Sequence, residues 1–122
     1  MEKSALRKNK EFAPGNWPVV YCMNIIGGKW KPSVLHMIRT DRNRYSILLK
    51  NIKEISKQTL TNQLRELESD GIIERIIYPE IPPRVEYKIT EYGKTLFPII
   101  DCMYQWGIKN MKLGAEGYCN EK

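Results

Sequence analysis

Residues 56–89 decide the fold, and they read SKQTLTNQLRELESDGIIERIIYPEIPPRVEYKI. One apolar stripe of an α-helix, with spacing i, i+4 and i+7, is formed by Leu60, Leu64 and Leu67. Ser56 is a residue type that caps the start of a helix, and Gly71 is one that ends it. The pattern therefore predicts a helix between these two residues.

The side of this helix opposite the leucines is polar. At about 100° per residue it is formed by Gln58, Thr61, Asn62, Arg65 and Ser69. Glu66 and Asp70 are turned well away from its centre, so the face holds donors, acceptors and one cation. Such a surface suits the edges of bases in the major groove of DNA.

The second half of the stretch predicts a β-hairpin. Residues 72–78 are rich in β-branched side chains, and residues 85–89 alternate apolar and charged side chains with period two. The connecting loop contains Pro82 and Pro83, which fix φ and stiffen it. Arg84 beside this loop is placed to meet a phosphate or a narrow minor groove, although an exposed arginine on an ordinary turn is the alternative.

Upstream, the spacing predicts three further helices or helical turns. Pro18 opens the first, with Val19, Met23 and Ile26 as its inner stripe. The second covers about 33–39 and the third covers 45–50. Short helices followed by a hairpin predict an α+β, mostly helical fold: a winged helix-turn-helix domain with a two-stranded wing.

The last helix is expected to cover residues 91–112, capped by Thr90 and bent at Pro98. Its apolar residues follow a 4-3-4-3 rhythm and cover a wider arc than one small domain can bury. We therefore expect a dimerisation helix, although packing into the protomer's own core is the alternative. The expected interface residues are Leu96, Ile99, Ile100, Met103 and Trp106.

The net charge of +6 is concentrated around the helix that begins near Lys57. Seven basic and two acidic residues lie between Arg39 and Arg65, so this segment holds +5 of that charge. A solvated basic face is the ordinary explanation, but its position beside a polar helix favours phosphate contacts. The expected phosphate contacts are Arg42, Arg44 and Lys57, beside base-reading Gln58, Thr61, Asn62 and Arg65.

Composition excludes several other classes of protein. The 122 residues fit one domain, read as an arm (1–16), a DNA-binding domain (17–112) and a polar tail (113–122). Three dispersed cysteines and one histidine predict no metal site, no cofactor and no catalytic motif, so we expect no enzyme. No apolar run reaches the roughly 18 residues of a membrane span, so a cytoplasmic location is expected.

Three segments together resemble the HxlR-type winged-helix transcription regulators, a branch close to the MarR regulators. These are IGGKWKP (residues 26–32), LTNQLRELESDGIIER (residues 60–75) and YPEIPPRVEYKITEYG (residues 78–93). With Trp106 and Gly107 they span most of the chain. The resemblance implies a homodimer that binds an inverted-repeat operator and regulates nearby genes.

The chain departs from this family pattern at two places. Trp17 stands before Pro18 where the family usually has a cysteine that in several members senses oxidants. In the third helix, Ile47 stands where the family commonly has a glutamate. The effector therefore stays open between a small molecule and a redox signal.

Other residues could serve an effector. Cys22 is a candidate thiol sensor, with Lys29 or Lys31 as cationic neighbours, but a cysteine there is more often a small buried hydrophobe. Cys102 lies beside the expected interface, and Cys119 lies in the tail. Aromatic residues that could line an effector pocket, or simply pack in the core or interface, are Trp17, Tyr21, Tyr104 and Trp106.

A rival from another class is a winged-helix module that binds a protein or ligand without binding DNA. The basic segment and the carboxylate-free centre of the polar face favour DNA, because an interaction module has little use for both.

Overall fold

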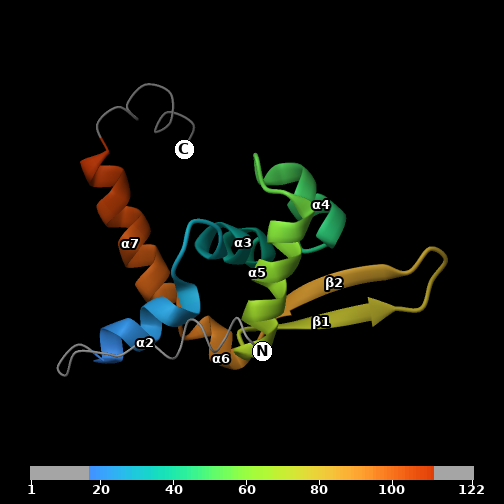
Figure 1. Cartoon of the computed structure of the whole chain (residues 1–122), viewed down its shortest axis with the longest axis horizontal. Helices are drawn as coiled ribbons and strands as arrows, with labels where there is room; N and C mark the ends of the chain where they lie inside the picture. The colour runs from blue at the N-terminus through green and yellow to red at the C-terminus, as the bar shows by residue number, and fades with distance from the viewer. Residues whose placement is uncertain (1–16, 112–122) are drawn as a thin grey trace.

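The computed structural model describes residues 17–111, and its fold is a winged helix-turn-helix. The elements are α2 (Trp17–Ile26), α3 (Lys31–Arg39), α4 (Tyr45–Asn51), α5 (Lys57–Ser69), β1 (Ile73–Tyr78), β2 (Arg84–Ile89), α6 (Glu91–Lys94) and α7 (Phe97–Asn110). The wing and α7 project from opposite sides of the helical core (Figure 1). The predicted fold class is confirmed; the expected arm and tail lie outside the described residues.

The core forms where α3, α4 and α5 meet. The stripe predicted for α5 is buried throughout, since Leu60, Leu64 and Leu67 are each at most 2% exposed. Ser56 caps this helix, because its hydroxyl oxygen accepts a hydrogen bond from the Thr59 N–H at 3.0 Å. Gly71 follows with φ of +79°, a left-handed conformation that glycine adopts without strain.

The wing is an antiparallel pair in which Ile73 faces Ile89 and Tyr78 faces Arg84. The turn before α4 joins it as a short third edge. Asn43 donates its side-chain amide to the Tyr87 carbonyl at 2.9 Å and accepts the Tyr87 N–H at 3.0 Å on its own carbonyl. The wing is therefore fixed to the helical core near its base.

The C-terminal helix differs from the prediction, because two helices replace the single bent one. Thr90 caps α6 by accepting the Gly93 N–H at 2.9 Å, as expected, but α6 ends at Lys94. Pro98 then lies in the first turn of α7, which ends at Asn110. Proline has no N–H to donate and clashes inside a helix, whereas the first turn needs no such donor, so it starts a new helix.

The inner stripe predicted for α2 is also wrong in part. Ile26 is buried, but Val19 is 62% exposed and Met23 is 51% exposed. The helix is apolar on most sides, so spacing alone does not select the buried side. Its C-terminal end, with Ile25 and Ile26, is buried in the core, and Cys22 packs partly against it.

A buried ion pair joins α3 to α5. Lys31, in the first turn of α3, is 3% exposed, and its Nζ contacts Glu66 Oε1 on α5. Burying a lone ammonium is costly, and the carboxylate offsets this only while both partners stay in place. The pair therefore fixes how α5 is rotated about its own axis.

We expect Glu66→Leu to lower the free energy of unfolding by about 3 kcal/mol, because it removes the carboxylate that offsets the buried Lys31 charge. The double variant Lys31→Met with Glu66→Leu should recover most of this loss. Urea unfolding at fixed protein concentration measures both. Glu91→Gln, which breaks an exposed pair with Lys94, is the control and should change little. Equal stability of wild type and Glu66→Leu would contradict the assignment.

Candidate nucleic-acid interface

The polar face of α5 is open to solvent. Gln58, Asn62 and Arg65 are exposed, while Thr61 is half-buried at the edge of the face. Because the leucine stripe is buried on the other side, these side chains point away from the core. The structure therefore brings together the four residues that the sequence assigns to base reading.

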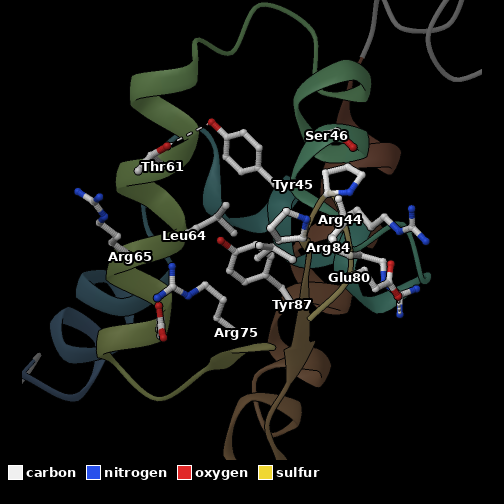
Figure 2. Close-up of a pocket in the computed structure, with 15 residues that line it drawn as sticks. Arg44, Tyr45, Ser46, Thr61, Leu64, Arg65, Arg75, Glu80, Arg84 and Tyr87 are labelled. Atoms are coloured by element: carbon white, nitrogen blue, oxygen red, sulfur yellow. Dashed lines mark hydrogen bonds and ion pairs between the residues drawn. The ribbon is translucent and has the colours of Figure 1, made fainter. Parts of the chain in front are cut away.

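Tyr45 is a neighbour of this face that the sequence analysis did not identify. Its hydroxyl lies 3.2 Å from the Thr61 hydroxyl and donates to the Lys57 carbonyl at 3.4 Å, as Figure 2 shows for Thr61. These contacts tie the start of α4 to the start of α5. No periodic pattern marks Tyr45, because the contact is between two helices.

A groove of about 640 Å³ lies between α5, the start of α4 and the wing (Figure 2). Four arginines line it, and Tyr87 is a buried part of its wall. Burial raises the pKa of Tyr87, so its hydroxyl stays neutral near pH 7. The arginines that line the groove are Arg44, Arg65, Arg75 and Arg84.

Arg84 is held within the wing rather than extended toward solvent. Its guanidinium stacks on Tyr78 at 4.0 Å and forms ion pairs with Glu80 at 3.0 Å and Glu86 at 3.5 Å. Glu86 also contacts Arg44 at 3.5 Å, so two predicted phosphate ligands share one carboxylate. Arg84 Nε is buried and has no hydrogen-bond partner within residues 17–111.

The basic segment predicted from sequence divides between two surfaces. Arg42 and Lys57 are exposed, and Arg42 donates to Thr40 Oγ1. Arg39, by contrast, bonds both Asp101 oxygens, at 2.8 and 3.1 Å, and belongs to the contact with α7. The +5 cluster is therefore not one continuous face, because one of its charges is used inside the protomer.

Arg75 is a groove cation that the sequence analysis missed. It is exposed on β1, directly opposite Tyr87 in the sheet, and shares the groove with Arg65. The register of the hairpin could have identified Arg75, because pairing residue 73 with residue 89 places Arg75 beside Tyr87.

A second exposed surface is apolar and is made by α2, α6 and α7. A hydrogen bond between Tyr21 and Tyr92, which raises the pKa of Tyr92, links α2 to α6. The aromatic residues considered for a pocket are all exposed, which excludes them from the core: Trp17, Tyr21, Tyr104 and Trp106.

The five residues predicted for a dimer interface differ in how far they are exposed. Ile99, Met103 and Trp106 are exposed, with Trp106 at 70%. Leu96, however, is 9% exposed within the protomer's own core, and Ile100 packs partly against that core. Leu96 precedes the first turn of α7, where the chain is still packed on the domain, so its assignment to an interface is corrected.

Cys22 is half-buried and packs against the core. The two lysines considered as cationic neighbours of the thiol make other contacts. Lys31 pairs with Glu66, and the Lys29 Nζ lies 4.8 Å from the centre of the Trp30 ring. This geometry favours a packing role for Cys22. Cys102 is exposed, and Cys119 lies outside the described residues.

The short helix α4, the turn after it, the polar helix α5 and the wing define a helix-turn-helix DNA-binding regulator. The chain belongs to the HxlR-like helix-turn-helix family, whose model matches residues 25–114. Across residues 17–111, no helix is long and apolar enough to cross a membrane. No group of three or more potential metal ligands occurs within the same range.

Relatives and solved structures agree with this assignment. An uncharacterized HTH-type transcriptional regulator of Methanothermobacter thermautotrophicus is 48% identical over 89 residues, which cover 73% of this chain and 68% of that protein. The HTH-type regulator YybR of Bacillus subtilis is 40% identical and covers 89% of this chain and 84% of its own. The oxidised redox regulator HypR superposes with a TM-score of 0.74 at 41% identity, over 78% of this chain and 98% of that one. These relatives are all named as regulators, two of them as HTH-type transcriptional regulators.

We expect Arg84→Ala to weaken binding to all DNA sequences and to flatten the salt dependence by about one unit, because one phosphate contact is lost. Glu80→Gln should have the opposite effect on affinity, because it releases Arg84 and removes a carboxylate that phosphate repels. Fluorescence anisotropy across a salt series measures both slopes. An unchanged slope in Arg84→Ala would remove this residue from the interface.

Proposed function

We propose that this chain is a sequence-specific transcriptional regulator that binds an inverted-repeat operator as a homodimer. The observation that carries the proposal is the open polar face of α5 beside an arginine-lined groove. The two features adjoin, because Thr61 and Arg65 of α5 also line the groove (Figure 2). Such a protein would act in the cytoplasm, where bacterial and archaeal DNA is found.

Base reading is assigned to Gln58, Asn62 and Arg65, whose side chains are exposed on α5. Amide side chains match adenine and arginine matches guanine in the major groove. Thr61 joins them at the edge, where its hydroxyl already contacts Tyr45. Tyr45 therefore helps to hold α5 in the orientation from which it reads the DNA.

Phosphate contacts are assigned to residues around this face. Lys57 lies at the N-terminus of α5, where the helix dipole also favours an anion. Arg42 and Arg44 precede α4, while Arg75 and Arg84 extend the basic surface onto the wing. Phosphates would compete with Glu80 and Glu86 for Arg84, so DNA would replace ion pairs that the free protein makes internally.

The homodimer is supported by the exposed apolar surface of α7. None of the fourteen residues of this helix is buried in the protomer, although Ile99, Met103 and Trp106 form a stripe along it. Soluble proteins rarely leave an aromatic and aliphatic stripe of this kind uncovered. A second copy supplies an identical stripe, and two-fold symmetry would present two α5 helices to an inverted repeat.

Two variants distinguish residues that read bases from residues that contact phosphates. Arg65→Ala should relax the preference at one base position by about 1–3 kcal/mol, whereas Lys57→Ala should weaken all sequences alike and lower the salt slope by about one. Anisotropy titrations with the duplex upstream of its own gene and with a scrambled duplex distinguish the two. A wild-type protein without DNA affinity at low salt would instead favour a protein- or ligand-binding module.

The α7 interface predicts the oligomeric state. Trp106→Glu and Met103→Glu should shift the protein from dimer to monomer in sedimentation velocity, because each buries a charge between two apolar helices. Gln105→Glu is the matched control, since Gln105 lies on the polar stripe with Asp101 and Lys109. A dimer that persists in both interface variants would place the contact elsewhere.

A further inference from the structure

The helix α7 is attached to the rest of the protomer at one end. Among residues 17–111, the core contacts of α7 are made by Phe97 and Ile100 in its first turn, and no residue of α7 is buried. Beyond this turn the helix extends away from the domain (Figure 1). A helix held at one end can tilt, so its direction depends on the few contacts near its start.

The most specific of these contacts is the pair between Arg39 and Asp101. The guanidinium donates to both carboxylate oxygens, at 2.8 and 3.1 Å, and also stacks on the Phe97 ring at 4.0 Å. A bidentate pair with stacking fixes orientation as well as distance. The hydrogen bond from Arg39 lowers the pKa of Asp101, so the pair stays ionised at neutral pH.

The helix α3, which carries Arg39 at its C-terminal end, contacts the recognition helix α5 at its N-terminal end. Arg39 ends α3, and Lys31 begins it and contacts Glu66 on α5. Between them Val34 and Leu35 are completely buried, so α3 cannot shift without disturbing the core. One rigid helix, about 13 Å long, therefore connects α7 to the base-reading surface.

We propose that Arg39 and Asp101 are positioning residues that set the spacing between the two operator half-sites. The inference rests on the proposed homodimer, in which α7 joins the copies and α5 reads the DNA. A tilt of about 10° over the roughly 20 Å length of α7 displaces a reading head by about 3.5 Å, close to one base-pair step. The pair determines which spacing fits without determining which bases are read.

The test uses the full-length protein and the duplex selected by wild type from a random pool. Duplexes are then made with the half-sites moved together or apart by one or two base pairs. Asp101→Asn and Arg39→Gln should reduce the preference for the original spacing by about 2- to 30-fold. Affinity for a single half-site and the dimer sedimentation coefficient should not change.

Two further variants separate positioning from loss of fold. The exchanged pair, Arg39→Asp with Asp101→Arg, should restore the spacing preference, which a general loss of stability would not allow. Glu91→Gln breaks the exposed pair with Lys94 inside α6 and should leave the preference unchanged. Circular dichroism melting checks that each variant is folded, and the exposure of Asp101 makes this the expected result.

Each outcome decides the inference. An Asp101→Asn protein that keeps the full spacing preference overturns it, as does an equal loss of affinity at every spacing or an exchanged pair that restores nothing. A wild-type protein that binds no duplex, or binds as a monomer, overturns the proposed function and the inference with it. A wild-type dimer whose spacing preference is lost only in the pair variants supports both.

Discussion

The buried ion pair between Lys31 and Glu66 is the constraint on which the arrangement of the reading surface depends. Lys31 is a charged residue in the core, and it contacts Glu66, which lies on α5 away from the centre of its polar face. Pairing them turns this carboxylate inward. A rotation of α5 by one residue, about 100°, would break the pair and bring a negative charge toward the phosphates. The same contact therefore supports the core and fixes which side of α5 stays exposed.

Other carboxylates hold individual arginines in fixed positions as well as neutralising part of the positive charge. Asp101 pairs with Arg39 on the side of α7, and Glu86 of β2 contacts both Arg44 and Arg84. A net charge of +6 thus becomes a pattern of positioned cations. Long side chains that are already ordered lose less entropy when a ligand arrives, so these internal pairs prepare the wing for a fixed partner.

Local patterns in the sequence were sufficient to predict α5, its caps and the wing, because Ser56, Gly71 and the leucine stripe act within a few residues of one another. Tertiary contacts were not predictable in this way. The partners of Arg39 and Arg84 come from other elements or a loop, and the packing of Leu96 depends on where the chain turns after α6. The spacing of apolar residues predicted a partner for α7 but not where the preceding helix ends, since the rhythm continues through the break before Pro98.

The exposure of α7 also bears on how long the protein persists in a cell. An isolated helix of fourteen residues is marginally stable in water, and the core packing of this one is at its first turn, next to the Arg39–Asp101 pair. In the proposed homodimer, helical order beyond that turn and association of the two copies should therefore form and disappear together. We expect any signal that separates two copies to leave a frayed apolar end, which is a good substrate for a protease. Release from the operator and removal of the regulator would then be successive results of one event.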